Sequence, residues 1–436
     1  MKKVLSFILA VGLVVSALAA CSSKEKKGET KDGKTTIEFW AAPNPAQEAY
    51  WKEIAKNFEA ENPDIKVNVS PMKESPTSEA GIQSALAAKQ APTISENINR
   101  GFAAQLAESK ALIPLNELNG WDEIISSRNM TETIKSWKFS DGNQYVLPIY
   151  SNSMLFGWRL DILKELGYDE APKTYNEVLD VTRKLKEKYP DKYLWAKTDL
   201  ADPTAWKRWF DFFMLYNAAS DGNAFIEGDT FIGDEDAGVK VLTFVDEIRK
   251  EKGILAKQVS DPFETGVGIF TDLGPWTFSY WEEKFPELKY GENFTLSLPP
   301  VPDGVDPEKA KTFADTKGLV VYANATKEQQ KAAMTFIHWV YANPENDMKW
   351  LEKTNLPPAR DDLADNEEFI QYFKDNPVLK PYAEAVPLGV PPMDNSKFNE
   401  LQTYIGQDAF NKIVNGEISP EKGWGDMKKA IEGDLK

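Results

Sequence analysis

The residue types that most often do chemistry in proteins are scarce in this chain. Its 436 residues include one cysteine, Cys21, and one histidine, His338. We therefore expect no zinc or copper site of the usual ligand types, no cofactor, no disulfide and no histidine-based catalytic set. His338 lies in the apolar helical pattern "AAMTFIHWVYA", which predicts packing. There is no phosphate loop and no Gly-x-Ser-x-Gly turn, so an acid and nucleophile pair among the 68 acidic residues is the catalytic arrangement left open.

Aromatic residues form the second distinctive group. The chain has 13 Trp, 15 Tyr and 23 Phe, which is more than a core of this size obviously needs. We therefore expect some of these rings to face a ligand.

The net charge excludes two classes of partner. The chain carries −17, and because the segment up to Lys34 holds seven lysines and three acids, the rest carries −21. Nucleic acids and anionic bilayers are bound by clustered Lys and Arg, so neither is expected as the ligand. The length of this remainder predicts two lobes, each with its own core.

Cys21 follows an N-terminal apolar segment. Two lysines precede a run of apolar residues that ends at Ala20, which is the layout of a secretory signal. The stretch "LAAC" resembles the lipobox of bacterial lipoproteins, in which the cysteine carries a diacylglycerol and becomes the first mature residue. A plain secretory signal beside an unrelated cysteine is the alternative. We predict a signal peptide over 1–20 and a lipidated flexible tether over 21–34.

The body alternates strand and helix patterns. "TTIEFWAAPNP" predicts a strand that ends at two prolines, 46–61 has apolar residues at helical spacing, and "IKVNVSP" at 65–71 alternates as a second strand. This order is the unit of a parallel sheet. Helical patterns recur at 178–189 and 239–248, and "KGLVVYA" at 317–323 predicts a strand covered on both faces. The last 40 residues predict helices only, and we expect an α/β protein.

Four stretches together resemble the extracellular solute-binding proteins of carbohydrate ABC transporters, the group that includes maltose-binding protein. They are "DGNQYVLPIYSNSMLFGWRLDILKELGYDEAPKTYNEVLDVTRKL", "TDLGPWTFSYW", "KGLVVYANATKEQQKAAMTFIHWVYANPENDMKWLEKTNLPPAR" and "ISPEKGWGDMKKAIEGDL". Their order and spacing cover 36–436. The resemblance implies an α/β periplasmic-binding-protein-like fold, in which two lobes joined by two or three hinge crossings close on a sugar in the cleft between them.

The resemblance also places the lobes. Lobe 1 is expected over 35–148 and 302–354, and lobe 2 over 149–301 and 355–436. The crossings would fall in three proline-bearing stretches, which are 148–151, 298–303 and 354–357.

A sugar offers a C–H face that packs on an aromatic ring, and hydroxyls that need paired donors and acceptors. Trp276 follows the turn Gly274-Pro275, and the family's tryptophan in this motif stacks on sugar. The other aromatic candidates are Trp40 at the end of the first strand and Trp206 and Trp209 in a predicted helix. Core packing is the alternative for each of these rings.

The candidate polar contacts lie in loops after strands or near the crossings. They are Asn44, Asn97, Asn99, Asn152, Asp272, Arg360 and Asp394. Arg360 is chosen because a planar guanidinium can bridge two hydroxyls or steady a carboxylate of the cleft. Asn97 lies within "APTISENI" and Asn99 directly follows it; this stretch stands where the family usually has a Pro-Asp before a strand.

Three functions follow from these patterns. The favoured one is a non-catalytic, monomeric receptor that binds an oligosaccharide at the outer face of the cytoplasmic membrane and delivers it to an ABC permease. The alternative is a surface-anchored glycoside hydrolase or lyase. A receptor for a peptide or a polyamine is weaker, because cationic ligands predict more carboxylates among the candidate residues.

Overall fold

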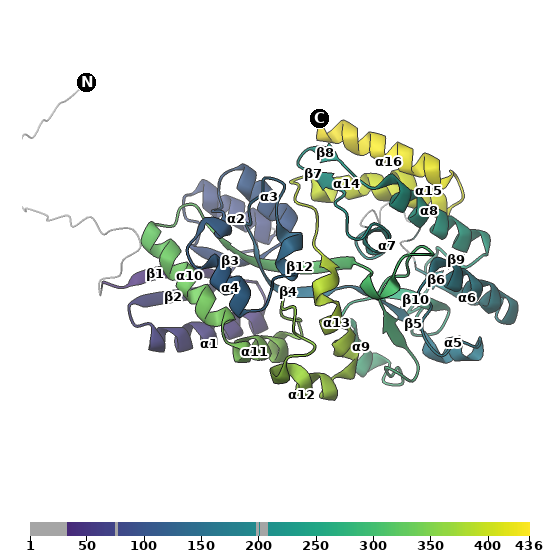
Figure 1. Ribbon diagram of the computed structural model, residues 1–436, viewed down its shortest axis with the longest axis horizontal. Helices are drawn as coiled ribbons and strands as arrows, with labels where there is room; N and C mark the ends of the chain where they lie inside the picture. The colour runs from purple at the N-terminus through teal and green to yellow at the C-terminus, as the bar shows by residue number, and fades with distance from the viewer. Residues whose placement is uncertain (1–32, 75–76, 198–199, 201–207) are drawn as a thin grey trace, which may run out of the picture.

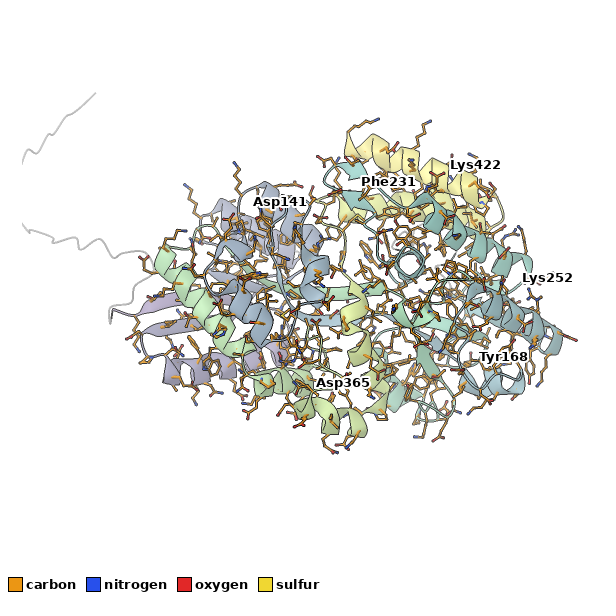
Figure 2. All side chains as sticks on the ribbon, viewed as in Figure 1. Asp141, Tyr168, Phe231, Lys252, Asp365 and Lys422 are labelled. Carbon is orange, nitrogen blue, oxygen red and sulfur yellow. The ribbon has the colours of Figure 1, made fainter. Side chains whose placement is uncertain are left out.

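The structure is a computed structural model, and it describes residues 33–74, 77–197, 200 and 208–436. Within this range it has two lobes, each a sheet with helices around it, joined by strands and loops at the centre (Figure 1). Side chains fill the interior of both lobes (Figure 2). The α/β fold class predicted from the sequence is confirmed. The predicted signal peptide, Cys21 and Trp206 lie outside the described residues.

The first lobe contains a six-stranded sheet. Its strands are β1 (Thr35–Ala41), β2 (Ile65–Pro71), β3 (Ile94–Ile98), β4 (Leu147–Ser153), β12 (Thr312–Val321) and β13 (Gly389–Val390). Strands β1, β2 and β3 are parallel, and β12 runs antiparallel to β3 on one edge and to β4 on the other. Alternation explains β1, because Ile37 and Phe39 are fully buried whereas Glu38 is exposed.

Helices of the first lobe pack on this sheet around one core. They are α1 (Pro45–Glu61), α2 (Ser78–Ala87), α3 (Arg100–Glu108), α4 (Trp121–Ser127), α10 (Lys327–Tyr341) and α11 (Pro344–Thr354). In α1 the side chains of Tyr50, Ile54 and Phe58 are buried, as their helical spacing predicts. His338 was expected to pack in the core, but it is exposed on α10, because the apolar stripe of this helix runs through Phe336, Ile337 and Val340.

The second lobe contains a five-stranded sheet in the order β11-β5-β10-β6-β9. These strands are β5 (Leu155–Trp158), β6 (Tyr193–Ala196), β9 (Ile254–Leu255), β10 (Gly268–Leu273) and β11 (Thr295–Ser297). The surrounding helices are α5 (Leu160–Glu165), α6 (Tyr175–Lys188), α7 (Phe212–Ala219), α8 (Glu235–Lys250), α9 (Thr277–Lys284), α12 (Glu367–Asp375) and α13 (Lys380–Ala385). The C-terminal part adds α14 (Phe398–Tyr404), a π-helical turn (Ile405–Phe410), α15 (Asn411–Val414) and α16 (Pro420–Leu435), and β7 (Ile226–Glu227) pairs with β8 (Thr230–Phe231) in a small hairpin.

The connections between the sheets lie later in the chain than 148–151, 298–303 and 354–357. Strand β4 stays in the first sheet up to Ser153, and β5 starts at Leu155 in the second. Val301 still bridges Thr174 of the second lobe, and the chain re-enters the first sheet only at β12. Ala359 still donates its N–H to Ile149 in β4. The lobe division over 35–148, 149–301, 302–354 and 355–436 remains a prediction.

Candidate functional site

The centre of the candidate site is the two-stranded ribbon that β4 and β12 form between the lobes. Asn152 lies opposite Asp315, and Tyr150 lies opposite Lys317. Residues directly opposite each other in an antiparallel pair point to the same side, and side chains alternate along a strand. Asn152, Asp315, Tyr150, Lys317 and Phe313 therefore share one face of the ribbon.

Two oxygen acceptors on this face have no protein donor within the described residues. Asn152 is 2% exposed, and its Oδ1 atom is buried without a hydrogen-bond partner. Asp315 is half-buried, and its carboxylate accepts no hydrogen bond from the described residues; burial raises the pKa of this carboxyl, and nearby Lys317 lowers it. Buried polar groups are nearly always paired in proteins. These two oxygens are thus available to donors from a ligand.

A β-bulge lies beside the ribbon, at the end of β3. Ser95 pairs with Val320 and Ile98 pairs with Gly318, so two residues of β3 oppose one residue of β12. The second of these, Asn97, has φ 63°, in the left-handed region that asparagine tolerates better than most residues. Bulges re-aim side chains and occur often next to functional sites. The bulge gives the predicted contact Asn97 a half-buried position at the edge of the site.

Glu96, the other bulge residue, ties this edge to the start of α1. Its carboxylate accepts the N–H of Ala42 and the indole N–H of Trp51. Burial raises the pKa of Glu96 to about 7, while these two bonds and the charge of Lys317 act in the opposite direction. A carboxyl that is held this way fixes the loop that leads from β1 to Asn44.

An aromatic wall continues from the ribbon into the second lobe. The ring centroid of Phe313 lies 5.9 Å from that of Phe210, which lies 6.0 Å from that of Trp276. Trp276 follows β10 and is 48% exposed. A Cβ atom on Gly274 would lie 2.3 Å from the Trp276 ring, so only glycine lets the indole lie over this turn. The wall therefore presents a partly exposed, positioned indole.

A charged pair stands at the ends of β6 and β10. The Nζ atom of Lys197 is 2.6 Å from a carboxylate oxygen of Asp272, and Asp272 is 12% exposed. Both residues come at or just after the carboxyl ends of parallel strands, as do Asn44 and Asn99 in the first lobe. Ligands of α/β proteins usually bind in the crevice outside such strand ends.

Three further predicted contacts of the first lobe, Asn44, Asn99 and Trp40, also stabilise the fold. The side-chain oxygen of Asn44 caps α1, and that of Asn99 caps α3 by accepting the N–H of Phe102 at 2.8 Å. Each keeps its side-chain NH₂ for other partners. Trp40 is half-buried at the edge of the first core.

Two predicted contacts pack against other side chains of the protein. Arg360 is 3% exposed, and its guanidinium binds Asp347 and Asp362 in a buried cluster. Trp209 lies before α7 and not within a helix, because Asp211 caps α7 only at Phe212.

The ring of Trp209 is half-buried among other rings. It stacks on Phe313 at 5.0 Å and packs against Phe213 and Phe398. It therefore packs against the aromatic wall at Phe313 and also lines a cavity between the lobes.

The predicted contact Asp394 connects the two lobes. It accepts the N–H of Ser140 and lies 3.6 Å from Arg100, which links the second lobe's loop to the first lobe.

A cavity of about 230 Å³ lies between the lobes next to this link. Arg100, Ser136 and Lys138 line it from the first lobe, and Trp209 and Asn217 from the second. Residues of both lobes line this cavity, so its volume depends on how the two lobes are placed relative to each other.

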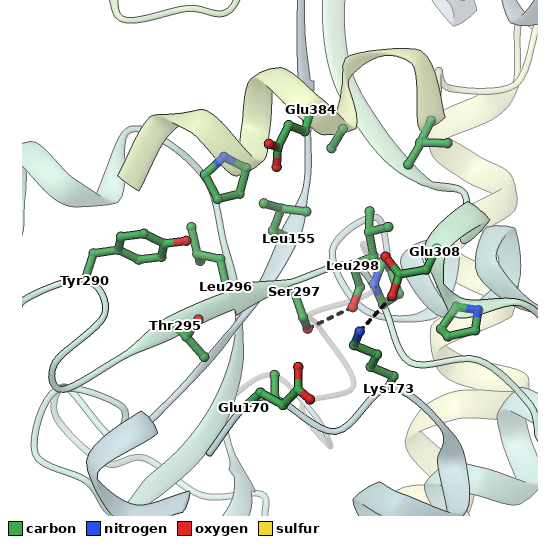
Figure 3. A pocket seen from close by; sticks show the side chains of 16 residues that line it. Leu155, Glu170, Lys173, Tyr290, Thr295, Leu296, Ser297, Leu298, Glu308 and Glu384 are labelled. Atoms are coloured by element: carbon green, nitrogen blue, oxygen red, sulfur yellow. Dashed lines mark hydrogen bonds and ion pairs between the residues drawn. The ribbon is translucent and has the colours of Figure 1, made fainter. Parts of the chain in front are cut away.

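A larger cavity of about 410 Å³ contains none of the predicted contacts (Figure 3). It lies beside the edge strand β11 and α13, and the ion pair between Lys173 and Glu308, 2.7 Å long, bounds one side. Its other charged groups, Glu170 and Glu384, are exposed. Because it is away from the strand ends and the open acceptors, we do not assign the ligand to it.

Sequence reasoning missed several residues of the site, which are Glu96, Lys197, Phe210, Phe313, Asp315 and Lys317. The alternation of "TFADTKG" ahead of an apolar run was the available signal for Asp315 and Lys317. In the described part of the chain no cluster of three or more His, Cys, Asp or Glu could hold a metal ion, and no helix is long and apolar enough to cross a membrane.

Two α/β lobes with a polar ribbon between them and ligand groups at the strand ends define a two-lobed binding protein. The chain matches the model of the bacterial extracellular solute-binding protein family over residues 53–380, and it belongs to that family. It therefore binds a solute for an ABC transporter outside the cytoplasm.

Similar proteins include one of Listeria monocytogenes EGD-e that is uncharacterized. Its sequence is 60% identical to this one, and its structure matches with a TM-score of 0.91. The match covers 92% of this chain and 100% of the Listeria chain. The cyclic alpha-maltosyl-1,6-maltose binding protein of Arthrobacter globiformis shares the fold at 17% identity and a TM-score of 0.77, over 93% and 100% of the two chains. The sn-glycerol-3-phosphate-binding periplasmic protein UgpB of Escherichia coli (strain K12) is 25% identical over 89% of this chain and 90% of its own.

Proposed function

We propose that this protein is a non-catalytic receptor that binds a neutral oligosaccharide and delivers it to an ABC importer by closing its lobes on the sugar. The observation that carries the proposal is the pair of open acceptors, Asn152 Oδ1 and the Asp315 carboxylate, on a ribbon that runs into an aromatic wall.

Unpaired acceptors select a ligand that donates hydrogen bonds. Sugar hydroxyls donate, and a hydrogen bond to a charged group contributes about 1.5 to 3 kcal/mol. Trp276 supplies the complementary surface, because the C–H face of a sugar ring packs on an aromatic plane. A site with a few converging polar groups and aromatic walls is typical of small-molecule binding.

The charges of the site disfavour a phosphorylated ligand. Asp272 and Asp315 bring two carboxylates, Glu96 brings a carboxyl whose pKa is about 7, and Lys197 and Lys317 bring two ammonium groups. Lys197 is paired with Asp272, and Lys317 is close enough to lower the pKa of both other carboxyls. A phosphate dianion would enter a site without excess positive charge. The ligand named for UgpB is therefore not carried over to this chain.

Calorimetric titration with maltose, maltotetraose, cyclic alpha-maltosyl-1,6-maltose and sn-glycerol-3-phosphate tests the proposal. Binding of one or more neutral sugars and none of the phosphate is expected, with the sugar recovered unchanged by chromatography. Shortened sugar would identify a hydrolase, and binding of the phosphate alone would overturn the proposal.

Trp276→Ala provides the matched variant. Because the indole is 48% exposed, apo thermal stability should hardly change, while sugar affinity should fall by at least about thirtyfold. Small-angle scattering of the wild type should show a smaller radius when the sugar is bound, if the lobes close.

The proposal includes a lipid anchor at Cys21 and a monomer that presents its sugar to the permease at the outer face of the cytoplasmic membrane. Cys21→Ala should leave the precursor uncleaved or release the protein from the membrane fraction. A variant that is still processed and membrane-bound would contradict the anchor alone.

A further inference from the structure

Two exposed aromatic side chains stand one helical turn apart at the start of α9. Among the described residues, the large apolar side chains that are exposed are Ile232, Trp276, Tyr280, Val305 and Ile370. Trp276 is 48% and Tyr280 is 47% exposed. No other two of these five are neighbours on one helix.

Helix geometry places both rings on the same side. Trp276 already has helical dihedral angles as the residue before α9, so the step to Tyr280 is four residues. A step of four residues along a helix is little more than one turn and advances about 6 Å along the axis. Side chains four residues apart are therefore neighbours on the helix surface. Phe278 and Trp281 point the other way, into the core of the second lobe, where they are 8% and 2% exposed.

Trp276 and Tyr280 differ in the aromatic rings that they contact. Trp276 continues the aromatic wall through Phe210, so it belongs to the candidate site. Tyr280 meets the ring of Phe285 nearly edge to face at 6.0 Å, which restrains it on the outer side. Glu283, whose side chain is 73% exposed, ends the aromatic part of this face one turn further on.

We propose that Trp276 and Tyr280 form one aromatic strip, on which Tyr280 carries the sugar unit next to the one stacked on Trp276. The inference rests on the proposed function and deepens it, because it makes chain length a determinant of affinity. Continuity with the wall identifies sugar as the occupant: the strip starts inside the site and leads outward over one helical turn. A ligand of two units, with one on the ribbon acceptors and one on Trp276, would leave Tyr280 uncovered, and a longer one would cover it.

Tyr280→Ala, Tyr280→Phe and the control Ile370→Ala separate the outcomes, with maltose, maltotriose and maltotetraose as titrants. Tyr280→Ala should weaken maltotetraose by roughly three- to tenfold and leave maltose unchanged. Tyr280→Phe should keep the wild-type values, because the ring carries the contact. Ile370→Ala, at an exposed residue of α12, should change neither sugar.

The results also distinguish this inference from the proposed function. Equal affinities of wild type and Tyr280→Ala for every sugar overturn the inference and leave the proposed function intact. Unchanged binding together with lost sugar uptake by cells would assign Tyr280 to the permease interface and overturn it as well. Failure of the wild type to bind any of the three sugars overturns the inference, whereas the proposed function still stands if cyclic alpha-maltosyl-1,6-maltose binds.

Discussion

The two ends of β4 treat buried polar groups in opposite ways. At its start, Arg128 donates to the carbonyls of Pro148 and Ile149 and pairs with Asp347, which also pairs with Arg360. We call Arg128, Asp347, Arg360 and Asp362 the arginine cluster. Near its other end, Asn152 and the facing Asp315 present oxygens that no protein donor meets in the described residues.

The difference separates stability from binding. Burying a charge costs several kcal/mol unless partners offset it. In the arginine cluster the protein supplies those partners, and the guanidinium of Arg128 also lies 3.7 Å from the ring centroid of Tyr341. On the ribbon the described residues supply no such partners for Asn152 Oδ1 and the Asp315 carboxylate. The cluster should therefore set the unfolding free energy, and the ribbon should set the affinity.

The largest expected effect comes from breaking the cluster. Asp347→Ala leaves Arg128 buried and without its carboxylate, and should lower the free energy of unfolding by about 3 to 5 kcal/mol. Chemical denaturation measures it. Lys135→Ala is the control, because its pair with Glu132 is exposed and should contribute at most about 0.5 kcal/mol. A loss below about 1 kcal/mol in Asp347→Ala would remove the distinction between the two ends of β4.

The next effect comes from the ribbon. Asp315→Ala removes an acceptor without breaking a protein hydrogen bond, so sugar affinity should fall by roughly ten- to hundredfold. Apo stability should stay equal or rise, because a buried carboxylate is lost. Calorimetric titration and thermal melting of the same sample test both parts, with the exposed Asp236→Ala on α8 as control. A large loss of apo stability with normal affinity would place Asp315 with the cluster.

The smallest effect is a pH dependence at Glu96, which is buried like the cluster but lies beside the ribbon. Its pKa rises from 4.5 to about 7, so the folded protein keeps this proton at pH values where the unfolded chain has released it. The contribution of Glu96 to stability therefore falls as pH rises from about 4.5 and levels off above about 7.

Glu96→Gln removes the titrating group and so isolates the pH-dependent contribution of Glu96 to the free energy of unfolding. Its stability relative to wild type should increase between pH 6 and 8 by roughly 1 kcal/mol, as measured by denaturation across the range. A difference that stays constant with pH would show that Glu96 does not titrate there.

Local patterns were enough to predict much of the fold. The alternation of Ile37 and Phe39 and the helical spacing of Tyr50, Ile54 and Phe58 are set by short-range periodicity and by burial on one face. The apolar helical neighbours of Trp339, Trp350 and Trp424 predict core packing for all three; Trp350 and Trp424 are buried, whereas Trp339 is half-buried. Such features need no knowledge of distant residues.

The site depends on distant pairings, and there the sequence fails. Arg360 looks like a ligand contact until α11 brings Asp347 to it, and Trp209 looks accessible until Phe313 and Phe398 cover it. Asp315 becomes a site residue only because β12 pairs with β4 and sets it opposite Asn152. A strand register of this kind is not encoded in either segment alone.

The pairing of β12 also has a consequence for the order in which the chain can fold. Strand β12 joins β3 and β4, and its contact between Ile94 and Val321 spans most of the first lobe's sequence. A chain that has emerged only up to residue 300 still has open edges on β3 and β4, because their partner has not been made. Closing so long a loop is slow, and secondary structure formed earlier lacks the strand that completes it. The sheet of the first lobe thus cannot be completed before Thr312–Val321 has been made.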